Sequence, residues 1–265
     1  MEILKNEPLG KHTTFKIGGK ADILYIPHTL DELKTVLSCT TSNIALIGNG
    51  SNLLVRDGGI RGTVIKICDT LKDLKVEANT IRAGAGVLIK DLINTAVENN
   101  LKGLECITGI PGALGGCVYM NASYTKEIKH LVKFVKAIDY KGNENIFFNP
   151  FLNWGYRSSV FHCKRYIITE VMLQLEKGHC SDIVKKYREK RQKAQPIEYP
   201  SAGSIFKKNN LKDFQGLAVG DAEVRKSFII NKGNATAKDV INLINLIKSK
   251  SKQEMDLEIE IVGED

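Results

Sequence analysis

Two glycine-rich stretches contain the residue types that bind phosphate groups. Residues 109–116, Gly-Ile-Pro-Gly-Ala-Leu-Gly-Gly, hold four glycines in eight positions, and residues 48–52 are Gly-Asn-Gly-Ser-Asn. Glycine lets the backbone approach a ligand closely, and a helix that begins near Pro111 would point free N–H groups at an anion. Ser and Asn side chains add donors in the second stretch. A tight turn before a closely packed helix is the alternative for either stretch alone.

Other nucleotide and metal motifs are missing from the sequence. Neither stretch, nor Gly84-Ala85-Gly86, completes G-x-G-x-x-G after a strand, and no G-x-x-x-x-G-K-[ST] occurs, so a Rossmann fold and a P-loop are disfavoured. The six cysteines form no C-x-x-C pair and the five histidines no H-x-x-x-H. We therefore expect reduced, mostly buried thiols and no metal site.

Composition indicates a globular protein that binds an anionic ligand. The 265 residues suit one large domain or two to three small ones, and 43% are apolar and 26% charged. No apolar run approaches the ~20 residues that span a bilayer, and the first residues do not resemble a signal peptide, which predicts a cytoplasmic protein. The net charge of +8 suits an anion, but many lysines lie in 185–193 and 248–252, where solvated helix faces are the alternative.

The elements that must position these residues mix strands and helices without a regular βαβ rhythm, which predicts an α+β fold. We divide the chain into three units, residues 1–67, 68–195 and 196–265. Thr29-x-x-Glu32 and Thr236-x-x-Asp239 predict helix starts, as Asn149-Pro150 does for a short helix. A further helix is expected in 87–100 and another in 182–193. Strands are expected at 21–27, 44–47, 74–77, 80–83, 132–140, 146–148, 166–175, 228–231 and 257–262, and another after the turn at 201–204.

Seven segments, in this order along the chain, resemble the UDP-N-acetylenolpyruvoylglucosamine reductase (MurB) family. The segments are 13–19, 48–52, 109–121, 156–161, 199–204, 231–237 and 258–263. The resemblance covers essentially the whole chain. It implies non-covalent FAD between two small lobes of the vanillyl-alcohol-oxidase type, a C-terminal α+β lobe that binds substrate, and NADPH as reductant. The short chain resembles the second MurB type, which lacks an extra loop over the substrate.

The resemblance also assigns residues to the cofactor and the substrate. For FAD it implies Gly48, Asn49, Gly50, Ser51, Asn52, Gly109, Ile110, Pro111, Gly112, Gly115, Gly116 and Asn121. Tyr156 and Lys207 are the substrate candidates. Arg191 and Lys193 are candidates for the UDP diphosphate, with a solvated helix face as the alternative.

Three residues match the catalytic positions of the family. In the implied reaction UDP-N-acetylglucosamine enolpyruvate receives a hydride at C3 and a proton at C2, while negative charge spreads into its carboxylate. Ser204 matches the proton donor and Arg157 the arginine that binds the carboxylate. Glu258 matches the acidic partner, and Glu260, two positions along the expected strand, is the alternative. Each residue alone is more often structural: Ser204 in a turn, Arg157 on the surface.

The sequence departs from the family at three places. Lys208 stands where Asn is usual, the stretch after it shrinks to residues 209–212, and Arg225-Lys226 replaces the usual Ser or His. Two other functions stay open: an FAD-linked oxidoreductase with another substrate, and a non-catalytic binder of nucleotides or RNA. The basic charge motivates the binder, but no basic stripe interleaved with aromatic residues supports it. We expect a monomer that binds neither nucleic acid nor membrane.

Overall fold

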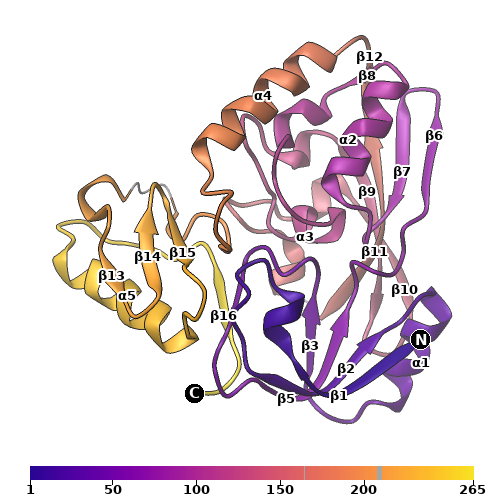
Figure 1. The fold of residues 1–265 in the computed structure, drawn as a ribbon. Helices are drawn as coiled ribbons and strands as arrows, with labels where there is room; N and C mark the ends of the chain where they lie inside the picture. The colour runs from indigo at the N-terminus through magenta and orange to yellow at the C-terminus, as the bar shows by residue number, and fades with distance from the viewer. Residues whose placement is uncertain (164, 208–210) are drawn as a thin grey trace.

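The computed structural model describes residues 1–163, 165–207 and 211–265, and the strands nearest the N-terminus form a mixed sheet (Figure 1). Its order is β1-β2-β5-β3, with β1 antiparallel to β2 and both β2 and β3 parallel to β5. The bounds are β1 Glu2–Pro8, β2 Lys20–Ile26, β3 Ile44–Ile47 and β5 Ile60–Lys66. The sequence predicted β2 and β3 but neither β5 nor the edge strand β1, whose residues are mostly polar and largely exposed.

Helix α1 (Leu30–Cys39) begins where its capping box predicts. The Thr29 hydroxyl accepts a hydrogen bond from the Glu32 N–H at 3.1 Å, which satisfies one free donor of the first turn. Its buried face, Leu33, Val36 and Leu37, packs into the core of the second sheet. The helix therefore joins the first two units of the chain.

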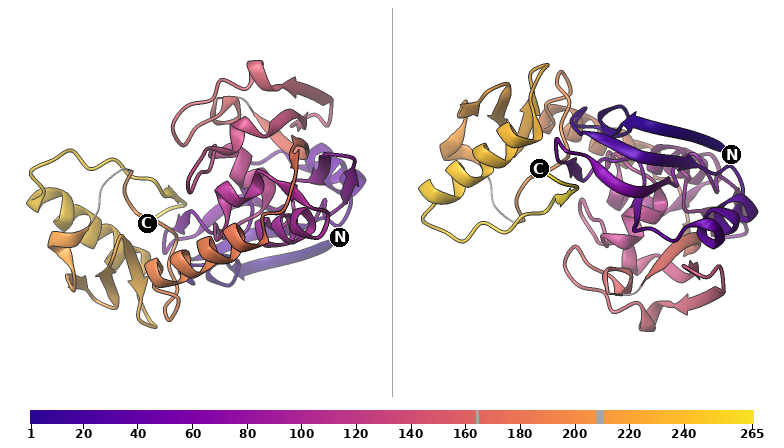
Figure 2. Two further views of the ribbon diagram at one scale, coloured as in Figure 1. Left: turned by 90° about the horizontal axis from the view of Figure 1, so that it is seen from above. Right: turned by 90° about the horizontal axis from the view of Figure 1, so that it is seen from below.

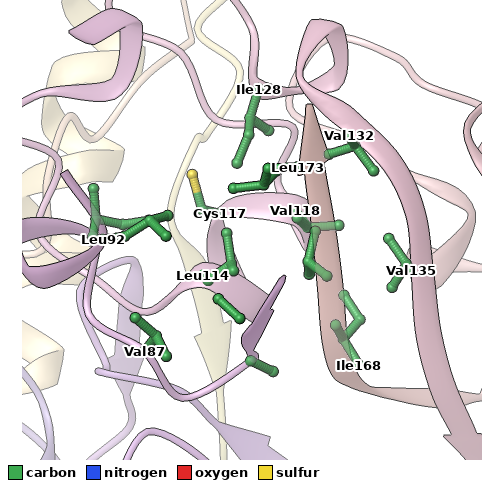
Figure 3. Packing of buried hydrophobic residues seen from close by; sticks show 14 of the residues in the cluster. Val87, Leu92, Leu114, Cys117, Val118, Ile128, Val132, Val135, Ile168 and Leu173 are labelled. Carbon is green, nitrogen blue, oxygen red and sulfur yellow. The ribbon is translucent and has the colours of Figure 1, made fainter. Parts of the chain in front are cut away.

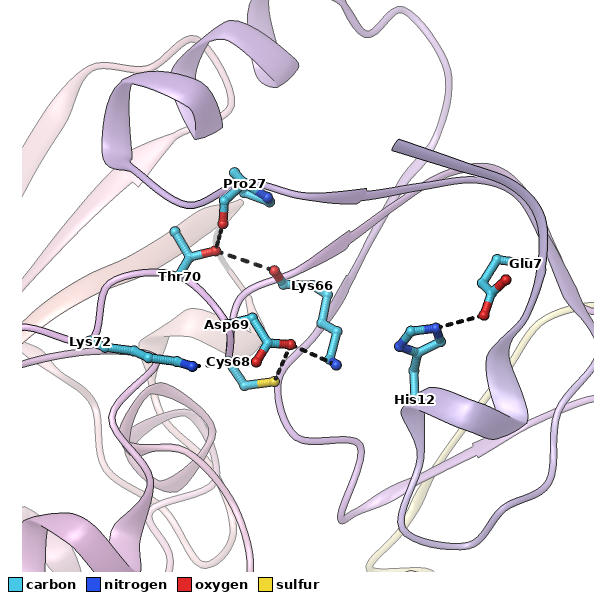
Figure 4. A network of polar contacts seen from close by, with 8 residues as sticks. All are labelled: Glu7, His12, Pro27, Lys66, Cys68, Asp69, Thr70 and Lys72. Atoms are coloured by element: carbon cyan, nitrogen blue, oxygen red, sulfur yellow. Dashed lines mark hydrogen bonds and ion pairs between the residues drawn. The ribbon is translucent and has the colours of Figure 1, made fainter. Parts of the chain in front are cut away.

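Residues 67–73 connect the first sheet to the second and are fixed by polar contacts (Figure 4). The hydroxyl of fully buried Thr70 donates to the Pro27 carbonyl oxygen. The Asp69 carboxylate pairs with Lys66 at 2.7 Å and with Lys72 at 3.5 Å, and these cations hold its pKa below the ordinary range although burial opposes them. The connection is thus ordered.

The second sheet is antiparallel, with order β10-β9-β11-β7-β6. Its bounds are β6 Leu74–Glu77, β7 Thr80–Gly84, β9 Val132–Asp139, β10 Glu144–Phe148 and β11 Tyr166–Gln174, as the sequence predicted within two residues. Two helices, α2 (Ile89–Glu98) and α3 (Leu114–Tyr119), pack on it. Figure 3 shows Leu114, Cys117 and Val118 of α3 between Leu92 of α2 and the strands.

The remaining elements of this unit are short, apart from helix α4 (Ser181–Ala194). A ribbon pairs β8 (Leu101–Lys102) with β12 (Glu176–Lys177) just before α4. The short helix predicted at Asn149-Pro150 forms as the 3-10 helix η4, but the Asn149 side chain does not cap it: its amide donates to the carbonyl oxygens of Lys129 and Val132 instead. In the part of the chain that the structure describes, the 3-10 helices are η1 Leu9–His12, η2 Leu104–Ile107, η3 Ile128–His130, η4 Asn149–Phe151, η5 Val160–His162 and η6 Lys212–Phe214.

The third unit lies to one side of the two sheets (Figures 1 and 2). It contains β13 (Ala218–Val219), β14 (Ala222–Arg225), β15 (Phe228–Asn231) and helix α5 (Ala237–Lys250), which begins at the predicted capping box of Thr236 and Asp239. The carboxylate of Asp57 accepts from the N–H groups of Ala237 and Lys238 at 2.8 and 2.9 Å, so the first unit also caps α5.

The C-terminal strand leaves this third unit. The predicted strand at 257–262 shortens to β16 (Glu260–Val262), which pairs in parallel with β4 (Leu53–Val55) beside the first sheet. The described residues 205–207 after the turn at 201–204 do not form the expected strand. Instead the segment makes isolated bridges, Ser201 with Ile230 and Phe206 with Leu257. Within the described ranges, no helix combines the length and the apolar character needed to cross a membrane.

Candidate functional site

The two glycine-rich stretches meet in the structure. Residues 48–52 connect β3 to β4, and residues 109–113 lead into α3. The Ser51 hydroxyl donates to the Pro111 carbonyl oxygen at 2.7 Å, which joins the two loops directly. Two stretches 60 positions apart therefore line one place, as a shared ligand requires.

Three glycines of these loops are required by the protein itself. A Cβ on Gly50, whose φ is +60°, would lie 2.4 Å from the His12 carbonyl oxygen. On Gly115 it would lie 2.9 Å from the Ala85 Cβ, and on Gly109 (φ +76°) 2.8 Å from the Arg191 Cγ. Packing and backbone conformation explain these three residues without a ligand, and the φ of +146° at Gly112 explains that glycine in the same way.

Gly48 and Gly116 have no such explanation. A Cβ on either residue would have no heavy atom within 4 Å, and neither has φ in the left-handed region. Open space beside glycines that the fold does not need is what a closely approaching ligand such as a pyrophosphate requires. These two glycines therefore leave room for a ligand such as FAD to approach the backbone.

Two N–H donors at the start of helix α3 are already used within the protein. It begins at Leu114, three residues after Pro111. The N–H groups of Leu114 and Gly115 are already bonded, to the carbonyl oxygens of Val87 and Ala85 at 2.8 Å each. These two first-turn donors hold α3 against the end of β7 and are not available to a phosphate.

Asn121, the residue predicted to support the cofactor loops, makes its side-chain contacts within the protein. It is fully buried, with φ +42°, and its side chain donates to the Gly155 carbonyl oxygen at 2.9 Å. It offers no surface to a ligand in this structure and instead holds the backbone two residues before Arg157. Ile110, half-buried, packs against the main core.

Arg157 lies at the centre of a polar cluster. It has φ +54° in a turn where Gly155 and Ser158 exchange main-chain hydrogen bonds. Its Nε donates to the Glu258 Oε1 at 2.8 Å and its Nη1 to the Ser123 Oγ at 2.8 Å. The Tyr156 ring lies 5.2 Å from the guanidinium carbon. A half-buried ion pair thus joins the second unit to the segment after α5.

The structure distinguishes Glu258 from Glu260. Glu258 precedes β16 and pairs with Arg157, whereas Glu260 lies within the strand, and a bend at Ile259 separates them. The Glu260 side chain reaches solvent, but desolvation by the surrounding protein raises its pKa. Its charge contributes to the raised pKa of Tyr119, about 12, of which desolvation is the larger cause.

Main-chain pairing brings the segment that carries Ser204 next to Glu258, the partner of Arg157. The Glu258 N–H donates to the carbonyl oxygen of Ile205, the residue after Ser204, at 2.8 Å. On the other side of Ser204, a Cβ on Gly203 would contact the Ser51 carbonyl oxygen at 3.5 Å. The turn at 201–204 therefore lies between the glycine loop and Glu258.

Lys207 lies on the same segment as Ser204. Its N–H donates to the Asp256 carbonyl oxygen at 2.8 Å, which extends the main-chain pairing between Ile205 and Glu258. Its charge acts on His162, whose pKa is lowered mainly by desolvation. The His162 ring stacks on Tyr119 with centroids 3.8 Å apart. Lys208 and residues 209–210, where the sequence departs from the family, lie outside the described residues.

Arg191 is not on a solvated helix face. Its Nη2 donates to the Gly109 carbonyl oxygen at 3.2 Å, and its guanidinium carbon lies 5.1 Å from the centre of the Tyr124 ring. Desolvation, with a smaller contribution from nearby Arg157, lowers its pKa. Lys193 is exposed. Ser123, the second partner of Arg157, was not predicted, because a lone serine carries no sequence signal.

The described residues contain no group of three His, Cys, Asp or Glu side chains that could hold a metal ion. The cysteines at 39, 68, 106, 117, 163 and 180 are all free. Burial raises the pKa of Cys68 to about 11 and that of Cys106 to about 12. These two thiols are therefore inert packing groups rather than nucleophiles.

The fold defines an FAD-binding protein. Residues 21–144 match the family described as FAD binding domain. The structure of 6-hydroxy-D-nicotine oxidase from Arthrobacter nicotinovorans, 16% identical, superposes with a TM-score of 0.50 over 66% of this chain and 42% of that one. The fold is thus the two-lobed FAD-binding fold of the vanillyl-alcohol-oxidase type with a C-terminal α+β lobe.

More specific matches identify the family. Residues 195–262 match the UDP-N-acetylenolpyruvoylglucosamine reductase C-terminal domain. The Clostridium tetani reductase of that name is 42% identical over 98% of this chain and 92% of its own length. The crystal structure of MurB from Thermus caldophilus is 30% identical, with a TM-score of 0.82 over 98% of both chains. The chain belongs to the UDP-N-acetylenolpyruvoylglucosamine reductase (MurB) family.

Proposed function

We propose that the protein reduces UDP-N-acetylglucosamine enolpyruvate to UDP-N-acetylmuramate for peptidoglycan synthesis, with non-covalent FAD as cofactor and NADPH as reductant. Relatives that carry this reductase's name are 41% and 42% identical to the chain. One observation carries the proposal: Glu258, which pairs with Arg157 at 2.8 Å, accepts a hydrogen bond at its main-chain oxygen from Asn52 of the glycine loop that Ser51 joins to Pro111. A cation for the substrate carboxylate is therefore adjacent to the cofactor loops. The reaction is proposed to take place in the cytoplasm on a monomeric enzyme.

Residues 48–52 and 109–116 would hold FAD, with the pyrophosphate against Gly48 and Gly116, where a Cβ would meet nothing within 4 Å. When bound, FAD supplies the hydride-transfer chemistry that amino-acid side chains lack. Residues 1–67 and 68–195 would form the two cofactor lobes and 196–265 the substrate lobe. In that division β16, which pairs with β4, attaches the substrate lobe to the first cofactor lobe.

The chain's own residues would act on the substrate. When C3 of the enolpyruvyl ether receives a hydride, negative charge develops at C2 and spreads into the carboxylate. Arg157 would bind that carboxylate and stabilise the charge, while Glu258 holds the guanidinium. The Ser204 hydroxyl would then donate its proton to C2, which completes the reduction of the double bond. Tyr156 and Lys207 would contact the rest of the substrate.

Two half-reactions on one sample test the proposal. The purified protein should carry a flavin spectrum, which anaerobic NADPH should bleach. Addition of UDP-N-acetylglucosamine enolpyruvate should restore the spectrum and yield UDP-N-acetylmuramate by mass spectrometry. A flavin that NADPH bleaches but this substrate does not reoxidise would indicate an oxidoreductase with another substrate. A protein that carries no flavin and cannot be reconstituted with FAD would contradict the proposed reductase. It would favour the alternative, a non-catalytic protein that binds nucleotides or RNA.

A further inference from the structure

We infer that Ser123 is a positioning residue for the substrate carboxylate, because it fixes the orientation of the Arg157 guanidinium. The inference rests on the proposed function, in which Arg157 receives that carboxylate. The Ser123 Oγ accepts a hydrogen bond from the Arg157 Nη1 at 2.8 Å, while Glu258 accepts from Nε at the same distance. The two acceptors come from different parts of the chain and bond to different nitrogens of the guanidinium.

Two hydrogen bonds fix the orientation of the guanidinium plane, whereas a single hydrogen bond would leave it free to rotate. With Glu258 alone bonded to Nε, the two Nη groups could swing about that contact. The bond from Nη1 to Ser123 fixes the plane, and the guanidinium geometry then leaves one N–H of Nη1 and both of Nη2 for a ligand. A planar carboxylate needs these donors at a defined angle, so orientation affects its binding directly.

The chemistry of the acceptor matters as well as its place. Glu258 brings a negative charge to Arg157, and a second carboxylate there would leave the site with a net negative charge. A hydroxyl accepts the hydrogen bond without cancelling the positive charge. Ser123 therefore orients the cation and leaves its attraction for an anionic substrate intact.

Ser123 lies on a segment that also holds the backbone of Arg157. The N–H groups of Tyr124 and Thr125, directly after it, bond to the Cys106 carbonyl oxygen at 3.0 and 3.1 Å. Asn121, two residues before it, is fully buried and donates to the Gly155 carbonyl oxygen at 2.9 Å. Residues 121–125 thus fix Arg157 at its backbone and at its guanidinium, as precise positioning requires.

Binding of two ligands to the oxidised holoenzyme tests this inference by calorimetry. UDP-N-acetylglucosamine enolpyruvate carries the carboxylate, and UDP-N-acetylglucosamine lacks it. Ser123→Ala should weaken binding of the first about 10-fold or more, the usual worth of a hydrogen bond to a charged group, and leave the second unchanged. Ser123→Thr, which keeps the hydroxyl, should restore most of the loss. In an Arg157→Ala background, Ser123→Ala should have no further effect.

A matched control is Ser38→Ala, which removes a hydroxyl that donates to the Thr35 carbonyl oxygen on the exposed face of α1. This variant should bind both ligands as the wild type does. Equal losses for both ligands, no loss for either, or an undiminished loss in the Arg157→Ala background would each overturn the positioning role. If wild-type holoenzyme neither binds nor reduces the enolpyruvyl substrate, the proposed function fails as well. If the wild type reduces it and Ser123→Ala behaves identically, this inference alone fails.

Discussion

The side-chain amide of Asn52 donates to the main-chain oxygen of Glu258 at 3.0 Å, and the N–H of Glu260 donates to the main-chain oxygen of Asn52 at the same distance. One residue of the glycine loop thus fixes the segment that carries the partner of Arg157. The proposed cofactor site and the proposed substrate site are therefore mechanically coupled through Asn52.

We expect Asn52→Asp to lower the free energy of unfolding by about 1–3 kcal/mol, because it replaces a donor with a charged acceptor that faces a carbonyl oxygen. Urea unfolding of the apoprotein measures the change. The control is Asn145→Asp, which alters an exposed amide bonded to the Asn143 carbonyl oxygen at 3.2 Å. Equal stability of the two variants would show that the Asn52 contact does not hold the C-terminal segment.

Substitution of Glu258 should slow the reaction with the enolpyruvyl substrate, and substitution of Glu260 should not. Glu258→Gln keeps an oxygen that can accept from the Arg157 Nε but removes the charge that holds the guanidinium. We expect it to slow reoxidation by the enolpyruvyl substrate by about 10-fold or more, since charge-assisted hydrogen bonds are about twice as strong as neutral ones. Glu260→Gln should reoxidise at close to the wild-type rate. The reverse order in stopped-flow measurements would move the acidic role to Glu260.

Glu260 should instead affect stability in a pH-dependent way. Its pKa is raised in the folded protein above the ordinary value of 4.5, so its favourable contribution to folding is full below pH 4.5 and is lost as pH rises through the folded pKa. Glu260→Gln resembles the neutral form at every pH. The variant should therefore exceed the wild type in stability at pH 7, and this gain should shrink toward pH 4.5. A gain independent of pH would exclude desolvation of the carboxyl as its cause.

Local signals in the sequence were sufficient for most elements of the fold. The capping boxes at Thr29 and Thr236 place α1 and α5, and alternation of apolar residues places the strands of the second sheet. Strand β1 was missed because its residues are mostly polar and show no strand pattern of their own. Its main-chain hydrogen bonds to β2 make it a strand. The pairing of β16 with β4 joins segments about 200 residues apart, which no local periodicity encodes.

Candidate site residues were harder to place than elements. The match to the family motifs pointed to Arg157 and Glu258, which the structure pairs. Motif spacing did not reveal that Asn121 is fully buried or that Arg191 bonds to the Gly109 carbonyl oxygen, because both facts depend on how α3 and α4 pack. Whether these residues serve the roles proposed for them stays a prediction.

The glycine loops give a test of cofactor binding that is independent of catalysis. Gly116→Ala adds a Cβ where nothing lies within 4 Å, and alanine favours a helix more than glycine does. We expect the apoprotein to be at least as stable as the wild type, yet to retain less flavin after gel filtration. Gly48→Ala should behave similarly.

Gly115→Ala is the contrasting variant, since its Cβ would lie 2.9 Å from the Ala85 Cβ. It should lower the thermal unfolding midpoint of the apoprotein itself. Full flavin retention in Gly116→Ala and Gly48→Ala would remove the pyrophosphate from these two positions.

The sharpest prediction concerns Ser204. The turn that carries it is held by neighbours, through Ile205 to Glu258 and through the Ser201 carbonyl oxygen to the Thr14 hydroxyl at 2.7 Å. Removal of the Ser204 oxygen should therefore spare folding and FAD binding. Ser204→Ala should be bleached by NADPH at close to the wild-type rate, because that half-reaction needs no proton delivered to carbon. Reoxidation by UDP-N-acetylglucosamine enolpyruvate should slow by roughly 10²–10⁴-fold, the usual contribution of a placed general acid. Both rates come from one sample, so differences in stability or expression cannot imitate the result.

Ser201→Ala, three positions earlier in the same turn, is the control and should leave both rates unchanged. Wild-type reoxidation by Ser204→Ala would end the assignment of Ser204 as the proton donor.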